Sequence, residues 1–366
     1  MTLKIGFIGL GLIGGSIAKA VRQYHPDSEI VAFNKNEESL ALAVKEGVVD
    51  VACSSVDENF SRCDYIFLCA PVSFNNAYLT QLKQIVDEMC ILTDVGSVKK
   101  PIHDEVIALG MEENFIGGHP MAGSEKSGYS NSKAILIENA YYILTLSEKV
   151  SPEKVEKMTA FIESLKAIPI VLDYEQHDCV TGTISHLPHL LATTLVNYVK
   201  ENDSDEELMK TLAAGGFKDM TRIASSSPVM WQQICVENSE KITVILEKFI
   251  SFLEQTKDKI EKKEAQALYD MFSSANDYRQ TVPDAAAGLI QKTFAFYCDI
   301  PDETGGIAAI ATVLANNQIN IKNIGIIHNR EFEEGVLKIE FYEEEALKKA
   351  IQILQEHQYV IYERSS

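Results

Sequence analysis

The sequence has no uncharged apolar run of the roughly 20 residues that a membrane-spanning helix needs. Its apolar beginning, from Lys4 to Ile17, includes five glycines and follows no basic segment, unlike a secretory signal peptide. There is no low-complexity tract and no internal repeat. These absences predict a soluble globular protein.

Positive charge is scarce relative to negative charge. The chain has 33 lysines and arginines against 53 aspartates and glutamates, a formal net charge of -20. A field of that sign repels phosphate, so we expect no nucleic-acid partner and no anionic membrane surface. A small anionic substrate is still compatible, because a local cluster of cations can outweigh the average charge.

Cysteine spacings typical of metal sites or of disulfide-bonded frameworks are also missing. Seven cysteines are scattered along the chain, form no CxxC pair, and lie in part within apolar runs such as residues 66–70. We therefore expect buried, reduced thiols in a cytoplasmic protein. No cysteine or carboxylate pattern completes a structural-zinc spacing with the histidines, so no metal site is predicted.

At 366 residues the chain is long enough for two or three domains. Residues 1–173 alternate short β-branched or aromatic runs with helical patterns. This alternation predicts an α/β domain whose parallel sheet is covered on both faces. The expected strands are 4–8, 29–33, 64–70, 90–94, 115–118, 141–146 and 168–172.

Helical patterns replace strands in residues 174–282, including one expected amphipathic helix from Trp231 to Ile260. One such helix cannot bury its own apolar stripe, so this domain should pack against neighbours or a second subunit. Residues 277–292 contain a proline, a glycine and an alanine run, and are predicted to be a linker. Residues 294–366 then follow the β-α-β-β-α-β order of a ferredoxin-like split unit.

A glycine-rich loop joins the first expected strand to the first helix. Its sequence is Gly9-Leu10-Gly11-Leu12-Ile13-Gly14, the GxGxxG pattern of a Rossmann-type, doubly wound domain. The first glycine permits a tight turn, the second lets a pyrophosphate approach, and the third allows close helix packing. Together with the helix N-terminus, this loop predicts NAD or NADP binding. The alternative is a merely structural glycine turn.

The choice between NAD and NADP depends on the end of the second strand. The acidic residue that usually bonds the adenosine ribose is replaced there by Asn34, which is followed by Lys35. Asparagine can bond a hydroxyl but lacks the charge that repels a 2′-phosphate. NAD is the default, NADP is left open, and Lys35 could instead be a solvated turn residue.

Four further segments are dense in polar residues. Two follow strands of the predicted sheet, at whose carboxyl ends ligands gather in doubly wound folds. The other two lie in the helical region. The segments are 94–99 (DVGSVK), 117–125 (GGHPMAGSE), 177–189 with its SHLPH run, and 217–223 (FKDMTRI).

The glycine loop and these motifs, in this order and at these spacings, resemble the prephenate and arogenate dehydrogenases over about residues 3–280. Residues 294–366 resemble an ACT domain, an amino-acid-sensing module appended to some members of that family. The resemblance implies a homodimeric oxidoreductase of three domains. These are dinucleotide-binding (1–173), helical for substrate binding and dimerisation (174–282), and ACT-like regulatory (294–366).

The family transfers a hydride from prephenate to NAD(P)⁺ while a base takes the ring-hydroxyl proton, and the resulting ketone loses carbon dioxide. The resemblance assigns this base to His119, and imidazole suits the task. Ser97 would orient the hydroxyl or the nicotinamide, and Arg222 would bind a substrate carboxylate. The other implied substrate-binding residues are His189, His177, Glu125, Asp219 and Trp231. Trp231 and some contacts to the side arm of the substrate could come from a second subunit.

The sequence also allows other roles for these residues and other functions for the protein. His119 could bond only backbone, and Arg222 could pair with Asp219 at the surface. Arogenate, with an amino group in place of the keto group, is not distinguished from prephenate. A β-hydroxyacid dehydrogenase shares the glycine loop but lacks GGHP and SHLPH. A non-catalytic sensor would not need His119, Ser97 and Arg222 together.

The third segment has one candidate regulatory position. Gly305 and Gly306 occupy the first strand-to-helix turn, where ACT domains seat a small amino acid. Tyrosine, the end product of the implied pathway, is the expected effector. Thr304 replaces the usual proline, so a purely structural helix start is the alternative.

Overall fold

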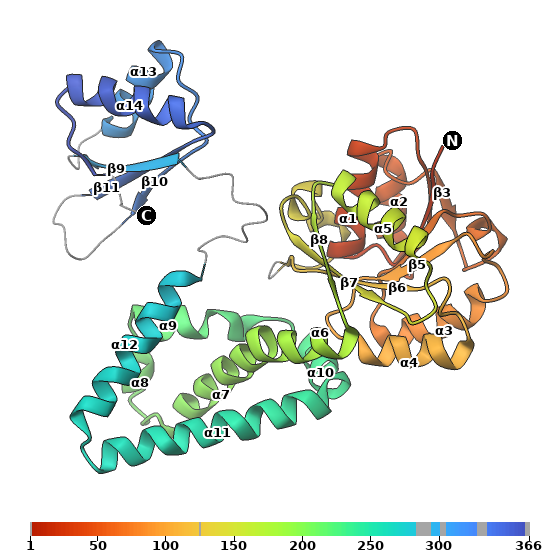
Figure 1. The fold of residues 1–366 in the computed structure, drawn as a ribbon, viewed down its shortest axis with the longest axis horizontal. Helices are drawn as coiled ribbons and strands as arrows, with labels where there is room; N and C mark the ends of the chain where they lie inside the picture. The colour runs from red at the N-terminus through yellow and green to blue at the C-terminus, as the bar shows by residue number, and fades with distance from the viewer. Residues whose placement is uncertain (1, 124–125, 283–293, 301–304, 328–334, 363–366) are drawn as a thin grey trace. The chain divides into compact units, whose positions relative to one another are not determined.

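The structure of the protein is a computed structural model that describes residues 2–123, 126–282, 294–300, 305–327 and 335–362 (Figure 1). The chain divides into two compact units, Met1–Gly288 and Leu289–Ser366. Each unit has its own hydrophobic core.

The first unit begins with a five-stranded parallel sheet in the order β3-β2-β1-β4-β5. Its strands carry runs of buried apolar residues, and in the register Phe7 lies between Ala32 of one neighbour and Phe67 of the other. This is the strand order of a Rossmann-like domain. The strands are β1 (Lys4–Ile8), β2 (Glu29–Phe33), β3 (Val51–Cys53), β4 (Tyr65–Leu68) and β5 (Ile91–Asp94).

Helices cover both faces of this sheet, as predicted. Ile5, Phe7 and Phe67 pack with residues of α1, α2 and α5 on one face. Ile66 and Leu68 pack with α3 and α4 on the other (Figure 1). The helices are α1 (Leu12–Tyr24), α2 (Glu37–Lys45), α3 (Val72–Leu82), α4 (Lys100–Leu109) and α5 (Pro152–Ser164), with a 3-10 turn, η1 (Glu58–Phe60), before β4.

Three more strands, β6 (Ile116–Pro120), β7 (Tyr141–Leu146) and β8 (Ile168–Leu172), extend the fold beside β5 through a bridge from Leu92 to Phe115. The prediction of a wholly parallel sheet is wrong here, because β6 and β7 are antiparallel. A parallel pair needs a crossover, usually a helix. The described part of the β6–β7 connection instead holds two 3-10 turns, η2 (Tyr129–Asn131) and η3 (Ala134–Leu136).

The rest of the first unit is helical. A π-helical turn, η4 (Gly182–His186), joins α6 to α7, and a 3-10 turn, η5 (Arg222–Ser225), follows α9. The helices are α6 (Tyr174–Thr181), α7 (Leu187–Asn202), α8 (Leu208–Leu212), α9 (Gly215–Thr221), α10 (Pro228–Glu237), α11 (Ser239–Glu261) and α12 (Ala265–Thr281).

The single helix predicted from Trp231 to Ile260 is interrupted at Asn238, which separates α10 from α11. The Asn238 side chain is buried and donates to the Asp178 carbonyl oxygen at 3.0 Å. Its Nδ2 also lies 3.1 Å from Nδ1 of His186. These tertiary bonds, which a periodic apolar pattern cannot indicate, hold the residue out of regular helix.

The predicted linker is also shorter than expected, because α12 continues to Thr281. Residues 283–292 of that linker lie outside the described residues. Large apolar side chains on α11 and α12 remain more than half exposed, as expected for helices that pack against another surface. They are Ile250, Phe252, Leu253, Ile260, Tyr269, Phe272 and Tyr278.

The second unit has the predicted β-α-β-β-α-β order. Its four antiparallel strands are arranged β10-β11-β9-β12, and residues such as Phe296, Leu337 and Leu354 form a separate core. The elements are β9 (Phe294–Ile300), α13 (Gly306–Asn316), β10 (Asn323–Ile327), β11 (Gly335–Phe341), α14 (Glu344–Glu356) and β12 (Ile361–Tyr362). In the described parts of both units, no helix is long and apolar enough to cross a membrane.

Candidate active site

The glycine loop lies between β1 and α1, with each glycine in a distinct environment. Gly9 has φ +101°, which favours glycine, and a Cβ there would lie 2.8 Å from the Cys69 backbone. A Cβ on Gly14 would collide with the Gly9 carbonyl oxygen. A Cβ on Gly11 would meet nothing within 4 Å. The loop therefore packs tightly at its first and third glycines and is open at the second, as a pyrophosphate site requires.

Leu12 and Ile13 form the first turn of α1, where backbone N–H groups lack intrahelical acceptors. Leu10 is held by a hydrogen bond from its N–H to Oδ1 of Asn34, at 2.9 Å. The Asn34 amide also donates to the Asn36 carbonyl oxygen at 2.9 Å. Asn34 thus ties the end of β2 to the glycine loop.

A pocket of about 430 Å³ lies at the carboxyl ends of β2 and β3. Asn34, Lys35, Glu37 and residues 52–54 are among the residues that line it. Lys35 is exposed, and its Nζ lies 5.4 Å from the ring centroid of Phe74. The lining therefore includes an amide, a cation and a carboxylate at the strand ends where a Rossmann-like fold binds the adenosine half of a dinucleotide.

The segment after β5 is organised around a buried ion pair between Asp94 and Lys99. Asp94 also accepts hydrogen bonds from the N–H groups of Gly96 at 2.9 Å and Gly118 at 3.1 Å. Lys99 donates to the Gly118 carbonyl oxygen at 2.6 Å, and its burial lowers the pKa of its ammonium group. Ser97 lies half-buried in this loop. The pair thus joins the end of β5 to β6.

Two glycines let β6 approach this ion pair. A Cβ on Gly118 would lie 2.5 Å from the Asp94 carbonyl oxygen, and one on Gly117 would collide with Oγ1 of Thr145. The next residue, His119, belongs to β6 itself, whereas the sequence placed it after the strand. Its position is thus set by strand register, opposite Ile143 of β7.

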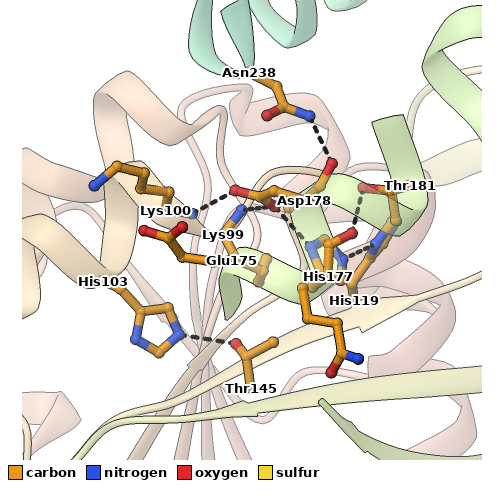
Figure 2. A network of polar contacts seen from close by, with 12 residues as sticks. Lys99, Lys100, His103, His119, Thr145, Glu175, His177, Asp178, Thr181 and Asn238 are labelled. Atoms are coloured by element: carbon orange, nitrogen blue, oxygen red, sulfur yellow. Dashed lines mark hydrogen bonds and ion pairs between the residues drawn. The ribbon is translucent and has the colours of Figure 1, made fainter. Parts of the chain in front are cut away.

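His119 is hydrogen-bonded to a histidine of the helical region (Figure 2). Its Nδ1 lies 2.8 Å from Nε2 of His177, and Nδ1 of His177 lies 2.7 Å from Oδ1 of Asp178. The Asp178 carboxylate accepts the backbone N–H groups of Lys99 and Lys100, each at 2.8 Å. Hydrogen bonds therefore join helix α6 to β6, at His119, and to the start of α4, at Lys99 and Lys100.

Burial lowers the pKa values of both histidines. For His119 the pKa is held well below its ordinary value by desolvation and by His177, Lys99 and His186. For His177 desolvation outweighs the opposing effect of the hydrogen bond to Asp178. Both imidazoles are therefore neutral near physiological pH, so His119 is able to accept a proton.

The remaining histidines lie along the π-helical turn and α7. His186 is buried, and its desolvation lowers its pKa to about 4. His189 is half-buried and stacks on Trp231 with ring centroids 3.8 Å apart. Its Nδ1 donates to the Ser185 carbonyl oxygen at 3.0 Å, which leaves Nε2 as an acceptor.

Arg222 begins the 3-10 turn after α9, and its side chain is exposed. It lies within electrostatic reach of His189, where its charge adds to desolvation in lowering the histidine pKa. Asp219 is exposed on α9. His119 and His177 are thus joined by a hydrogen bond, and the Trp231 ring contacts His186 and His189. The charge of Arg222 acts on His189.

The structure does not place every sequence-predicted residue relative to this group. Glu125 lies outside the described residues, and Gly305 and Gly306 belong to the second unit. His177 is fully buried with both ring nitrogens engaged, a different environment from the pocket-lining position implied by the resemblance. Among the described residues, no three His, Cys, Asp or Glu side chains gather in a way that could hold a metal ion.

Sequence reasoning noted Asp178, Asp94 and Lys99 within polar segments but gave them no role. Asn238 was missed entirely. The adjacent His-Asp pair near a helix start was the available signal for Asp178, because a carboxylate beside a histidine can orient the ring.

A Rossmann-like sheet, a glycine loop open at its second glycine and a neutral histidine at a strand end define a nicotinamide-dependent dehydrogenase. Two family models match the chain. "Prephenate dehydrogenase, nucleotide-binding domain" matches residues 17–171, and "Prephenate dehydrogenase, dimerization domain" matches residues 173–274. The chain belongs to the prephenate dehydrogenase family.

Individual relatives agree with this assignment. The chain is 37% identical to prephenate dehydrogenase of Bacillus subtilis, over 95% of this chain and 94% of that one. It is 36% identical to prephenate dehydrogenase of Lactococcus lactis, over 96% and 97% of the two chains.

Two solved structures are similar in fold. The Aquifex aeolicus prephenate dehydrogenase in complex with hydroxyphenyl propionate and NAD⁺ has a TM-score of 0.73 and 33% identity, covering 77% of this chain and 99% of that one. Arogenate dehydrogenase of Synechocystis has a TM-score of 0.69 and 27% identity, covering 76% and 99%. The family model that matches residues 17–171 is a nucleotide-binding domain, which agrees with the glycine loop between β1 and α1.

Proposed function

We propose that the protein catalyses the NAD(P)-dependent oxidative decarboxylation of prephenate to 4-hydroxyphenylpyruvate. The observation that carries this proposal is His119, a neutral histidine at the carboxyl end of β6 that is hydrogen-bonded through Nδ1. Such a group can take the proton of the substrate ring hydroxyl. The similarity to the Bacillus and Lactococcus prephenate dehydrogenases supports the choice of substrate.

NAD(P)⁺ held at the glycine loop would supply the acceptor for the hydride on the carbon that bears the ring hydroxyl. His119 removes the hydroxyl proton as that carbon becomes a carbonyl. The C–C bond to the ring carboxylate then breaks, its electron pair enters the ring, and carbon dioxide leaves. Ser97, in the loop after β5, is proposed to orient the hydroxyl or the nicotinamide.

The substrate carries two carboxylates into a chain of net charge -20, so a local cation is needed. Arg222 is the proposed carboxylate-binding residue, because guanidinium makes charge-assisted bonds to carboxylates. His189 and Trp231, stacked together, would form a wall of the substrate site. Glu125 and Asp219 are proposed as acidic partners of the arginine.

The function can be tested directly by following the formation of NADH or NADPH through its absorbance. Prephenate and arogenate should each be supplied with NAD⁺ and with NADP⁺, and prephenate is expected to be the better substrate. Turnover of arogenate alone would make the protein an arogenate dehydrogenase, the second candidate, which the similarity to the Synechocystis enzyme supports. No turnover in any of the four combinations would overturn the proposal.

Cofactor preference gives a separate test at Asn34. Replacement by aspartate should shift kcat/KM towards NAD⁺, because a carboxylate accepts ribose hydroxyls and repels a 2′-phosphate. One aspartate oxygen can still accept the Leu10 N–H, whereas the other would face the Asn36 carbonyl oxygen, so some loss of stability is expected. The ratio of kcat/KM for the two cofactors is the measurement. If this ratio does not change, Glu37 of the same pocket is the next candidate for the residue that contacts the ribose hydroxyls.

We also propose the domain limits 1–173, 174–282 and 294–366, and a cytoplasmic homodimer. Exposed apolar side chains on α11 and α12 and the match to a dimerization-domain model support the dimer. The third domain is proposed to be an ACT domain that binds tyrosine. Its support is the antiparallel sheet order and Gly305, whose φ of +96° starts α13 at the first strand-to-helix turn.

Ending the chain after residue 290 should leave an active enzyme that tyrosine inhibits less than it inhibits the full chain. Regulation requires that tyrosine bind one conformational state better than another, and the proposed ACT domain would supply that difference. Tyrosine titrations of both forms at saturating substrate are the measurement, because saturation suppresses competition at the active site. Identical curves would show that this domain does not sense tyrosine.

A further inference from the structure

We propose that Asp178, acting through His177, is a positioning residue that fixes His119 in the tautomer whose Nε2 can accept a proton. The inference deepens the proposed function and rests on His119 as the base. It begins from the hydrogen-bonded chain Asp178–His177–His119, which crosses from α6 to β6 (Figure 2).

In the series Asp178–His177–His119, the direction of each hydrogen bond follows from Asp178, the first residue. Asp178 is buried, and its oxygens accept the N–H groups of Lys99 and Lys100, so the carboxylate acts as an acceptor. Nδ1 of His177, 2.7 Å from Oδ1, must therefore carry a proton. The neutral His177 ring then has a lone pair on Nε2, which accepts from Nδ1 of His119. His119 is left with an unprotonated Nε2.

The opposite tautomer of His119 would disrupt this chain. Without a proton on Nδ1, His119 would present a lone pair to the lone pair of His177 at 2.8 Å. Its Nε2 would carry hydrogen and could not take the substrate proton. Fixing the tautomer therefore selects the reactive form of the base before the substrate arrives.

The same chain stabilises the charge that forms during the reaction. Protonated His119 keeps its Nδ1–H bond to His177, and the Asp178 carboxylate offsets part of the positive charge from the far side of that ring. Within the part of the chain that the structure describes, the pKa values of these two rings are also affected by Lys99, by its ion-pair partner Asp94 and by His186. Asp178 is thus the carboxylate joined to His119 through hydrogen bonds.

Asp178 also holds the fold together, so stability alone cannot test this role. Its carboxylate caps the start of α4, and its carbonyl oxygen accepts from Asn238. An Asp178→Asn variant would lose some of these bonds whether or not the residue acts on His119. The test needs a readout that a purely structural role would not change.

That readout is the pH profile of kcat/KM in Asp178→Asn, with Glu175→Gln as the control. The first variant should lower the plateau of kcat/KM by about 10²–10³, because the amide can impose the wrong tautomer. Its acid limb should move to lower pH, because imidazolium loses a compensating charge. Glu175 lies on the same helix with an exposed carboxylate 2.8 Å from Lys241, and its variant should match wild type. A reduced Tm with an unmoved acid limb would overturn the proposal.

A second pair of variants tests the link at His177. In His177→Gln a side-chain oxygen can still accept the His119 Nδ1–H, whereas His177→Leu has no acceptor. We expect the glutamine variant to retain turnover within about 10-fold of wild type, and the leucine variant to lose about 10²-fold. Equal losses in both variants would contradict a role based on tautomer control.

Nitrogen-15 NMR of the histidine side chains tests the tautomer without turnover. In the resting full-length protein, the His119 ring should carry its proton on Nδ1, with the signal assigned by its absence from a His119→Asn sample. A proton on Nε2 would overturn the inference. Failure of the wild type to oxidise prephenate or arogenate would instead overturn the proposed function, so the two failures are distinguishable.

Discussion

Replacing His119 by asparagine is expected to lower kcat by about 10²–10⁴ with little change in KM. Asparagine can keep a hydrogen bond to His177 and fits the same place in β6, but it cannot take a proton. The loss should therefore fall on the chemical step rather than on substrate binding. Steady-state kinetics with prephenate, across pH, is the measurement.

His25→Gln is the matched control for this variant. His25 belongs to the same domain and is partly buried, with its Nε2 2.7 Å from Oγ of Ser164. It has no part in the proposed chemistry, so kcat and KM should stay near wild type. If His119→Asn turns over at a rate close to that of the control, His119 is not the base.

Removing the Arg222 side chain should chiefly raise KM for prephenate. A charge-assisted bond to a carboxylate contributes about 1.5–3 kcal/mol, which corresponds to an increase of about 10- to 150-fold. Arg222→Lys should recover part of this loss, because it restores the charge but not the bidentate geometry. Initial rates over a wide range of prephenate concentration give both constants.

Lys218→Ala provides the control, because this lysine is exposed on α9, four residues before Arg222. It removes one positive charge near the same turn and should change KM little. If Arg222→Ala leaves KM unchanged and lowers only Tm, the arginine belongs to a surface ion pair instead.

The parts of the fold that could be predicted are those set by local pattern. Apolar runs predicted β1 and β2 to the residue, and the glycine loop indicated the parallel dinucleotide-binding sheet. The three-residue β3 was too short to give an alternating pattern. Residue periodicity predicts a strand but not the direction in which it runs beside its neighbour. The antiparallel pairing of β6 with β7 could therefore not be predicted from it.

The site shows the same division between local and tertiary information. Motifs singled out His119, His189 and Arg222, because their residue types suit proton transfer and carboxylate binding. Nothing local indicated that Asp178 would accept two N–H groups at the start of a helix about 80 residues earlier in the chain. The break at Asn238 has the same origin, since its cause is a bond to residues of α6 and the π-helical turn.

The paired glycines before His119 have a consequence for how this strand can evolve. Any side chain at Gly118 would press against Asp94, and any at Gly117 against Thr145, so the backbone would have to shift. His119, the next residue, would shift with it. In a mutational scan these two positions should therefore give loss-of-activity phenotypes although neither offers a functional group. Sequence change in this strand is therefore restricted by its close packing against Asp94 and Thr145.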